Sequence, residues 1–498
     1  MTFFTYKDYG ITYDERVEYS AGKFLLSYLT KPTVFTYVEE LVDNTNGYIT
    51  QRQIPLFSPY SRVYPMLLNI FNPKFYFERF HLQNLIAGYF LFLFSYLLFY
   101  LVYKDGKKAV IAPLLIFLTS FISGHIPANP KDIPFATTLL LGVLAVSFFL
   151  NRRTNTSVRI LALGIIFGIA QSQRTVGLTL FGSYFLIGFL LSKTHGEILN
   201  HLVESVLIFT VSLLTWVTLL PFLGANLTSN FIYLISSASA FKGWDNKIFY
   251  LGEFLSKEQR PWHYLFVYLL VKLPLTTIFA FFIGTMFLIR KRLSYSLKHP
   301  ITLLALIVSL NLLLYLLLHP VIYNGIRHFL YLAVCITLIA AFLLVDVFCN
   351  KSFRHRRVFA ILLSAYTVFT LIRMVHLHPY EYIYFNELVG GLRGAQNLFE
   401  TDYWGAAYKE GTKYVTNAVR TNNTKDLKVY ACNNAFVVSY YSEFRYAVVN
   451  RSQNADIVIC DTFIENQRKI YNGAVIHSIK REGVPINNIR AGNKRAGL

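Results

Sequence analysis

Charged residues are scarce in this sequence, and their scarcity argues against an ordinary soluble domain. Only 15% of the 498 residues are Asp, Glu, Lys or Arg, whereas 54% are hydrophobic and 17% are aromatic. A single soluble core of this length does not accommodate so much apolar surface. The composition therefore indicates a polytopic α-helical membrane protein.

Motifs for several chemistries are also missing. The sequence contains no Walker loop, no dinucleotide-binding glycine fingerprint and no Cys/His spacing typical of a metal site. It has no internal repeat of the kind found in many transporters. Four cysteines are too few for a disulfide scaffold, although Cys432 and Cys460 are candidates for one bridge. These absences argue against a nucleotide-driven reaction.

Acidic residues are outnumbered, 27 against 47 basic ones, giving a net charge of +20. Nucleic-acid binding is one explanation of such a charge, but it requires a continuous basic face. Here the basic residues fall in short links between apolar runs, and every second link is basic, which is the positive-inside pattern of cytoplasmic loops. We therefore expect a lipid bilayer and no nucleic acid as partner. The basic links contain Lys104, Lys107 and Lys108; Arg152, Arg153 and Arg159; Arg290, Lys291, Arg292 and Lys298; and Lys351, Arg354, Arg356 and Arg357.

Apolar runs of roughly 17–25 residues recur from Leu85 onward, each long enough to cross a bilayer as a helix. We expect about ten transmembrane helices within a domain spanning residues 85–378. Their expected positions are 85–103, 109–124, 134–150, 158–173, 175–192, 202–222, 263–289, 301–319, 327–348 and 357–376.

Two polar regions flank this domain, and the charge pattern places both outside the cytoplasmic membrane. Residues 1–84 are interrupted by prolines, which favours a loop region with short helices near 16–30 and 62–70. No basic start followed by an apolar stretch opens this region, so we expect a further helix to belong upstream of it; the alternative is that helix 85–103 carries the loop across. Residues 379–498 are expected to form a small extracytoplasmic α/β domain, with a helix near 404–420 and strands at 427–432, 445–449, 456–460 and 474–479.

Four polar clusters fall on the outer side. Asp14 and Glu15 lie in the first region, and the link 125–134 contains His125, Lys131 and Asp132. Charges at a helix mouth suggest a function, whereas the simpler explanation is that Lys131 and Asp132 pair and snorkel.

The other two clusters add cations. Arg174 lies between two nearly continuous apolar runs, a costly place unless it meets an anion, although a snorkelling arginine is an equal alternative. Arg327 and His328 begin a helix, where the dipole also favours an anion, although His328 has a second reading as an ordinary interfacial histidine. An activated sugar on a lipid phosphate needs such a set: a carboxylate takes the proton of the acceptor hydroxyl, and cations stabilise the departing phosphate.

The chain resembles the GT-C membrane glycosyltransferases, specifically the bacterial relatives of dolichyl-phosphate-mannose protein mannosyltransferase and of lipid A aminoarabinose transferase. The resemblance rests on residues 9–15 (YGITYDE), residues 129–135 (NPKDIPF), Arg174 with Gly177, and residues 325–328 (GIRH). A further similarity, residues 378–391 and 402–405 (DYWG), is to an uncharacterised bacterial branch.

The resemblance implies roles for these residues. Asp14 is expected to be the general base, with Glu15 beside it orienting or binding substrate. His125, Lys131 and Asp132 are expected to line the same cavity, and Arg174, Arg327 and His328 to contact the lipid phosphate. The resemblance implies no essential metal and no cofactor, a polyprenyl-phosphate sugar as donor, and a glycan, lipid or protein as acceptor.

The alternative function is a polytopic transporter or lipid flippase. That function predicts ionisable residues at mid-membrane depth and repeated halves. Glu204 and Asp346 are the few acids in or near the apolar runs, and both fall toward the cytoplasmic ends. A structural membrane protein is a third hypothesis, and it leaves the outer charges without a role.

Overall fold

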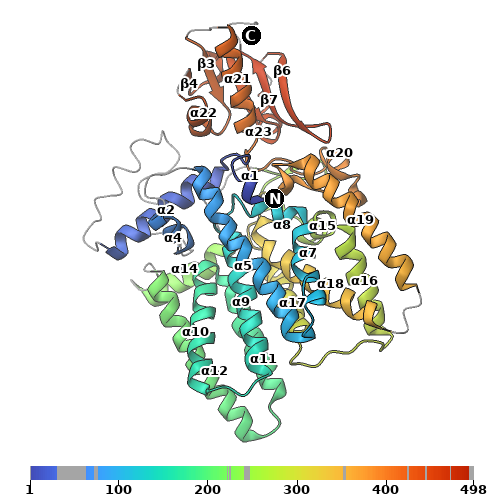
Figure 1. Cartoon of the computed structure of the whole chain (residues 1–498). Helices are drawn as coiled ribbons and strands as arrows, with labels where there is room; N and C mark the ends of the chain where they lie inside the picture. Colours follow the sequence, from blue (N-terminus) through green and yellow to red (C-terminus); the bar gives the residue numbers. More distant parts are fainter. Residues whose placement is uncertain are drawn as a thin grey trace.

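Helix α18 (Leu330–Cys349) runs through the centre of a helical bundle and is buried along nearly its whole length. In this computed structural model the bundle carries a small domain of strands and helices at one end, drawn at the top of Figure 1, and the N-terminus lies between the two. The structure describes residues 2–30, 63–71, 77–220, 223, 226–239, 247–350, 355–422, 426–443, 446–470 and 473–492.

Seven helical segments in the described ranges are long and apolar enough to cross a bilayer. They are α5 (Phe77–Tyr103), α9 (Asp132–Leu150), α10 (Thr156–Gln173), α12 (His195–Leu219), α17 (Pro300–Leu318), η2 with α18 (Arg327–Cys349) and α19 (Arg356–Leu377). An eighth candidate is the pair α15 (Tyr264–Lys272) and α16 (Leu275–Ile289), bent by 109°.

The remaining expected spans are helical but short or broken. The run at 175–192 forms η1 (Thr175–Gly177) and α11 (Leu178–Leu191), and the run at 109–124 forms α6 (Gly106–Ala109), α7 (Ile111–Leu118) and α8 (Ser120–His125). The expected polytopic helical architecture is therefore confirmed, whereas the number of spans stays a prediction. The break between α15 and α16 has a local cause, because Leu273 precedes Pro274 and is extended, with ψ 138°.

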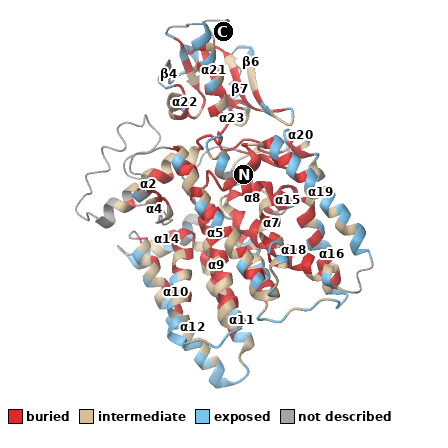
Figure 2. Cartoon of the chain, in the orientation of Figure 1, coloured by how far each residue is buried: buried red, intermediate tan, exposed pale blue. Residues whose placement is uncertain are grey.

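Small residues let neighbouring helices approach closely. A Cβ on Gly164 or Gly168 of α10 would lie 2.6 Å or 2.5 Å from side-chain atoms of Val211 and Thr215 in α12. Such close approach of backbones provides the packing that holds helices together in lipid. The outer faces of α10 and α12 are largely exposed in Figure 2, as expected for helices that face lipid.

Among the described residues before the bundle are the helices α1 (Thr2–Thr5), α2 (Tyr13–Thr30) and α4 (Val63–Phe71). The last two confirm the helices expected near 16–30 and 62–70. They pack together so closely that a Cβ on Gly22 would clash with the backbone of Pro65. The long link after α12 holds α14 (Leu227–Ser239) and a hairpin of β1 (Ile248–Tyr250) and β2 (Glu253–Leu255), which we did not predict.

The C-terminal part forms one five-stranded sheet in the order β4-β3-β5-β7-β6. β3 pairs in parallel with β4 and β5, whereas β7 pairs antiparallel with β5 and β6. The expected α/β character is confirmed, but β7 and the helices α20, α22 and α23 were not predicted. The elements are η3 (Glu381–Ile383), η4 (Glu387–Val389), α20 (Gly391–Ala395), α21 (Tyr408–Asn422), β3 (Lys428–Ala431), α22 (Ala435–Tyr441), β4 (Ala447–Val449), η5 (Ser452–Asn454), β5 (Ile457–Asp461), α23 (Thr462–Arg468), β6 (Val475–Arg481) and β7 (Val484–Ala491).

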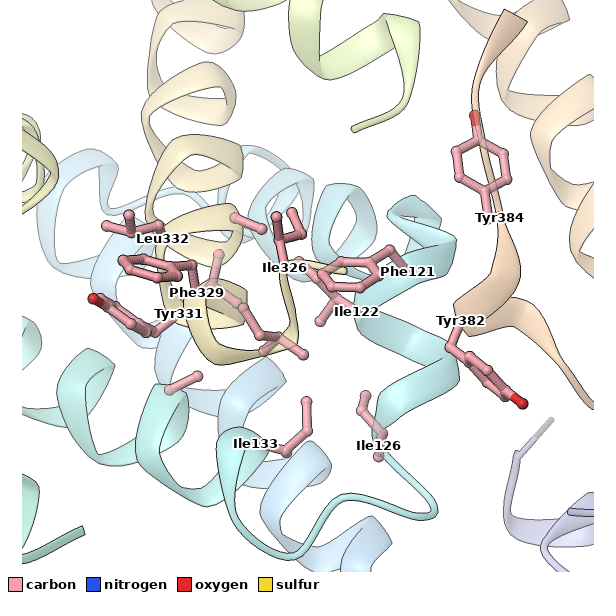
Figure 3. Packing of buried hydrophobic residues seen from close by; sticks show 14 of the residues in the cluster. Phe121, Ile122, Ile126, Ile133, Ile326, Phe329, Tyr331, Leu332, Tyr382 and Tyr384 are labelled. Carbon is pink, nitrogen blue, oxygen red and sulfur yellow. The ribbon is translucent and has the colours of Figure 1, made fainter. Parts of the chain in front are cut away.

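Apolar side chains fill the bundle directly below the polar links. Phe121 and Ile126 of the link after α7, Ile133 of α9 and Ile326 before α18 meet in one buried cluster (Figure 3). This packing fixes the ends of α8, α9 and α18 relative to one another. The polar residues that begin or follow these helices are therefore held over a rigid floor. The boundaries at 84 and 378 that we expected for the domains stay predictions.

Candidate functional site

Two segments from opposite ends of the chain lie against each other above the bundle. The N-terminal motif (residues 9–15) runs along the Trp404 segment (residues 399–409), and the amide of Tyr13 donates a hydrogen bond of 3.1 Å to the carbonyl of Trp404. A Cβ on Gly10 would clash with the carbonyl of Ala406. Gly405 has φ +70°, and a Cβ there would lie 2.6 Å from Cζ of Tyr13. The contact therefore requires glycine at both positions.

Asp14 is presented by the first turn of α2 and stays partly open to solvent. Its side chain is 32% exposed, and Oδ2 forms an ion pair with Nη1 of Arg327. The same oxygen accepts a hydrogen bond of 3.2 Å from Nε1 of Trp404. The positive end of the α2 dipole also stabilises the carboxylate. Asp14 is thus held by the two partners from one side and accessible from the other.

Arg327 is buried, with only 6% of its side chain exposed. Its guanidinium lies 5.4 Å from the ring centre of Tyr323 and 5.9 Å from that of Trp404. Within the described residues, Nε is buried and has no hydrogen-bond partner. A donor left in this state costs free energy, so the guanidinium still has the capacity to bind one further acceptor.

Glu15 points away from Asp14. Its side chain is fully buried, with Oε1 2.7 Å from Nε2 of His81 and Oε2 accepting hydrogen bonds from the amide (2.7 Å) and hydroxyl (3.1 Å) of Thr12. These contacts tie the start of α2 to α5. We predicted that Glu15 orients or binds substrate, but its surroundings favour positioning of the motif.

The link before α9 is organised by Asn129. Its Oδ1 accepts hydrogen bonds from the amides of Lys131 (3.2 Å) and Asp132 (2.8 Å), while Nδ2 donates to Oδ2 of Asp132 at 3.0 Å. Asp132 is buried and forms an ion pair with Arg174, which ends α10. Lys131 pairs with Glu18 of α2 at 3.8 Å. Asp132 has Arg174 as its ion-pair partner, although the charge of Lys131 also acts on its carboxylate.

His125 connects this link to the Trp404 segment. Nε2 lies 2.9 Å from the hydroxyl of Tyr403, and the imidazole lies 4.4 Å from the ring of Trp404. His125 is completely buried. It is therefore placed to support Trp404, and through it Asp14, from below.

The predicted cations converge around His328. Its ring packs edge-on against Tyr323 at 4.6 Å, and the charges of Arg327, Arg174 and Lys131 all act on the imidazole. The acidic pair, the link before α9, the end of α10 and the start of α18 thus meet at one end of the bundle. The structure brings together every residue that the sequence singled out except Glu15, which faces His81.

Glu400 is an acid of the site that we did not predict. It is buried, and its two oxygens accept hydrogen bonds of 3.1 Å each from the amides of Phe249 and Gly325. Burial raises the pKa of Glu400 to about 7. Because Gly325 is two residues from Arg327, Glu400 sets the position of the link that carries the arginine.

Asp402 organises the Trp404 segment. Its Oδ1 accepts hydrogen bonds from the hydroxyl of Tyr382 (2.6 Å) and from the amides of Trp404 (3.1 Å) and Gly405 (2.9 Å). The acids of this segment have no spacing that points to chemistry, so the sequence signal was confined to the DYWG similarity at residues 402–405.

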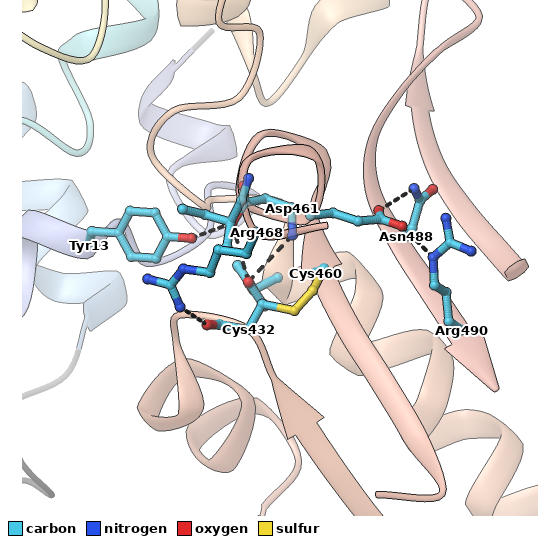
Figure 4. The surroundings of a disulfide bond; sticks show 10 residues. Tyr13, Cys432, Cys460, Asp461, Arg468, Asn488 and Arg490 are labelled. Atoms are coloured by element: carbon cyan, nitrogen blue, oxygen red, sulfur yellow. Dashed lines mark hydrogen bonds and ion pairs between the residues drawn. A yellow bond between two sulfur atoms is a disulfide. The ribbon is translucent and has the colours of Figure 1, made fainter. Parts of the chain in front are cut away.

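The C-terminal domain also touches the N-terminal motif. The hydroxyl of Tyr13 donates a hydrogen bond of 2.6 Å to Oδ2 of Asp461, and Asp461 follows Cys460 at the end of β5 (Figure 4). Cys460 forms a disulfide with Cys432, which confirms the bridge that we considered. Burial and the nearby Asp402 raise the pKa of Asp461 to about 7. Tyr13, which directly precedes Asp14, is therefore bonded to the disulfide-linked sheet.

Two solved structures of one protein superpose on this chain with TM-scores above 0.5 and decide the fold. ArnT from Cupriavidus metallidurans bound to undecaprenyl phosphate superposes with a TM-score of 0.54, covering 100% of this chain and 97% of that one at 9% identity. The apo state of the same protein gives 0.52, with 98% and 95% covered at 10% identity. An apo oligosaccharyltransferase from Archaeoglobus fulgidus gives 0.41, with 90% and 69% covered at 12% identity. No family model and no curated protein matches the sequence.

This chain has the GT-C fold. The lipid A aminoarabinose transferase ArnT is a GT-C membrane glycosyltransferase, so the fold that the sequence resemblance implied is confirmed. At these identities the likeness extends to the fold alone. Activity and substrate have to be argued from the residues of this chain.

Within this GT-C fold, the acids that a transport pathway would use are occupied elsewhere. Glu204 pairs with Arg159 at 2.5 Å and accepts a hydrogen bond of 2.9 Å from Tyr184. Both oxygens of Asp346 accept hydrogen bonds of 2.7 Å from tyrosine hydroxyls. Both acids thus have structural partners within the bundle, which gives no support to the alternative of a transporter or flippase.

Proposed function

We propose that this protein transfers a sugar from a polyprenyl-phosphate donor to an acceptor hydroxyl at the outer face of the cytoplasmic membrane. Asp14 acts as general base and the cations opposite it bind the lipid phosphate. One observation carries the proposal. In a GT-C fold, the partly exposed carboxylate of Asp14 forms an ion pair with the buried Arg327, whose Nε donor has no hydrogen-bond partner among the described residues.

Arg327 is the main phosphate-binding residue. A guanidinium presents several donors in a plane and binds a phosphate through two oxygens at once, so the free Nε of Arg327 provides the second contact. Lys131 and Arg174 add positive potential at the same place, and their charges act on the imidazole of His328. When the donor phosphate binds, Arg327 exchanges its bond to Asp14 for bonds to phosphate, and the carboxylate becomes available to the acceptor.

The reaction balances with these groups. The acceptor oxygen attacks the anomeric carbon, the bond from that carbon to the phosphate oxygen breaks, and Asp14 takes the proton of the hydroxyl. The lipid phosphate leaves with the negative charge, which Arg327 stabilises as it develops. Attack opposite the leaving group inverts the anomeric centre. Trp404, whose indole N–H contacts Asp14, holds the carboxylate in place.

The orientation follows from charge at the two ends of the helices. Asp132 begins α9, and Arg327 begins the span that contains α18. Arg152 and Arg153 follow the other end of α9, and a basic link precedes α17 at that same end of the bundle. The positive-inside rule puts that second end in the cytoplasm. The disulfide of the C-terminal domain is typical of an oxidising compartment and supports the same orientation. The N-terminal motif and the C-terminal domain, residues 379–498, are then extracytoplasmic.

The test is transfer from defined donors. The ArnT structure with the same fold contains undecaprenyl phosphate, so undecaprenyl-phosphate sugars are the first donors to try. Purified protein in nanodiscs is given a panel of these donors with labelled sugars and an envelope extract as acceptor source. We expect one donor to lose its label to an acceptor and release undecaprenyl phosphate. If every donor stays intact while undecaprenyl phosphate itself binds no more tightly than a neutral prenol, the proposal is wrong.

A further inference from the structure

A cavity of about 330 Å³ opens at the end of the bundle opposite the candidate site. It is lined by residues at the end of α5, residues that follow α9, and residues at and just before the start of α17. Helix α9 has 19 residues and starts at Asp132 in the candidate site, so the cavity lies roughly 28 Å away at about 1.5 Å per residue. This separation matches the thickness of the hydrocarbon core of a bilayer, about 30 Å.

Three cations line the cavity: Lys104, Arg152 and Lys298. Each comes from a different basic link of the sequence, and the lining contains no acidic residue. Within the described residues, none of the three forms an ion pair. Three positive charges that converge on one cavity repel one another, although solvent screens them because all three residues are exposed, and an anion bound between them relieves this repulsion.

In the described part of the chain, the nearby acids form no ion pair with these cations. Asp346 accepts hydrogen bonds from Tyr103 and Tyr295, and Asp105 accepts from the amides at the start of α6. Lys104 lies over the ring of Tyr100 at 5.8 Å and Arg152 over that of Phe148 at 5.0 Å.

The link regions are also tied to each other. Asn151 donates a hydrogen bond of 3.2 Å to the carbonyl of Lys298, which joins the end of α9 to the start of α17. His299 caps α17 by accepting from the amide of Ile301 at 3.2 Å, and the positive end of this helix dipole faces the same region.

The lining has an apolar part as well. Leu101, Val102 and Pro300 lie beside the cations, and Leu101 and Val102 belong to the last turn of α5. A ligand with a phosphate next to a hydrocarbon chain fits such a surface, because its charge meets the cations and its first carbons meet the leucine, valine and proline. Basic pockets between transmembrane helices on the cytoplasmic side bind anionic lipid headgroups in this manner.

We propose that this cavity binds a phosphate group, supplied by the headgroup of an anionic membrane lipid in the cytoplasmic leaflet. The ligand joins the ends of α5, α9 and α17 and replaces the missing counter-ion. The site is separate from the outer phosphate site by the thickness of the membrane, and it exists whether or not the protein transfers a sugar. Anionic lipid therefore stabilises the folded protein.

The test compares two variants of the full-length protein with equal loss of charge. Lys104→Gln/Arg152→Gln/Lys298→Gln removes the lining cations, whereas Arg153→Gln/Arg290→Gln/Lys291→Gln removes three exposed cations from the same end of the bundle that do not line the cavity. Native mass spectrometry measures binding of phosphatidylglycerol to protein in phosphatidylcholine nanodiscs. Each cation beside an anionic lipid is worth about a fivefold change in affinity, so three cations are worth roughly 100-fold.

We expect the lining variant to bind phosphatidylglycerol roughly 100-fold more weakly and the control variant to bind like wild type. A photoreactive phosphatidylglycerol added to wild-type protein is expected to label peptides containing residues 101–104 or 298–300, a result that does not depend on folding of a variant. Equal affinity of the two variants, or labelling elsewhere only, would overturn the proposal. Displacement of the lipid by millimolar inorganic phosphate would assign the cavity to a soluble phosphate and overturn the lipid as its source.

Discussion

The guanidinium of Arg327 and the carboxylate of Asp14 form an ion pair between positions 313 residues apart in the sequence. The pair joins the N-terminal motif to the start of α18 and occupies both groups before any substrate arrives. In the reaction that we propose, exchange of this pair for a lipid phosphate makes the base available. The variants below separate the groups that bind phosphate from those that hold the base in place.

Replacing Arg327 tests its role toward the phosphate. Arg327→Gln removes a charged donor from the developing phosphate and is expected to lower kcat roughly 100- to 1,000-fold. Arg327→Lys keeps the charge but loses the planar fork, so its kcat should lie between those of Arg327→Gln and wild type. Steady-state kinetics with the active donor measure both. A Gln variant with unchanged kcat and unchanged donor KM would remove Arg327 from the mechanism.

His81→Ala tests whether Glu15 positions the motif. The substitution leaves a buried carboxylate without its partner, which costs about 3–5 kcal/mol in the free energy of unfolding. We expect a lower Tm and, for the fraction that stays folded, transfer within about tenfold of wild type, because Glu15 does not reach Asp14. Unchanged Tm with abolished transfer would instead make Glu15 a substrate contact, as the sequence suggested.

Tyr13→Phe tests the contact with the C-terminal domain. The hydroxyl of Tyr13 bonds to Asp461, so its loss frees the backbone next to Asp14. We expect kcat to fall roughly ten- to a hundredfold while donor KM stays constant, since misplacement of a reacting group acts on the chemical step. Tyr414→Phe is the matched control, since Tyr414 lies in the same domain and stacks on His477. Equal kinetics of the two variants would show that the contact has no part in positioning Asp14.

The raised pKa of Glu400 predicts how stability changes with pH. Burial moves this pKa from 4.5 to about 7, against the opposite pull of Lys272 and Arg327, so between these values the native state holds a proton that the unfolded state has released. Stability contributed by this group is therefore highest below about pH 4.5, falls as pH rises toward about 7 and stays low above it. Glu400→Gln is expected to flatten the Tm profile between pH 5 and 7. An identical slope in wild type and variant would refute the assignment.

Cys349 provides a direct test of orientation. It is exposed at the end of α18, opposite Arg327, whereas Cys335 is buried and the other two cysteines form the disulfide. A membrane-impermeant maleimide should leave Cys349 unlabelled in spheroplasts and label it in inverted vesicles. Asp426→Cys, exposed in the C-terminal domain, should give the reverse pattern. Labelling of Cys349 from outside would place the candidate site in the cytoplasm.

The sequence predicted the features that depend on local pattern. Apolar runs predicted the helices, and the quoted motifs pointed to Asp14, Asp132, Arg174 and Arg327, which the structure places at one end of the bundle. These residues lie at helix ends, where chain position alone determines on which side of the bundle they emerge. The orientation that the alternating basic links indicate stays a prediction. The strands β3 to β6 were also predicted, because each coincides with a run that is rich in β-branched or aromatic residues.

The contacts that hold the site could not be predicted from the sequence, because they join segments that are far apart along the chain. Trp404 reaches Asp14 across 390 residues and Tyr13 reaches Asp461 across 448, and no spacing rule links such positions. The partner of Glu15 could not be predicted for a similar reason. His81 belongs to a helix that begins 62 residues later, at Phe77, and adjacency to Asp14 says nothing about where a side chain points. In α2 successive residues diverge by about 100° around the helix.

The most direct test of the account is single-turnover transfer by Asp14→Asn. The variant keeps the shape of the side chain and its contact with Trp404 but cannot accept a proton. With donor bound, we expect its rate of sugar transfer to fall at least about 100-fold while its affinity for undecaprenyl phosphate is retained, and Asp426→Asn, an exposed control, to match wild type. A folded Asp14→Asn protein that transfers sugar at the wild-type rate would contradict the central claim.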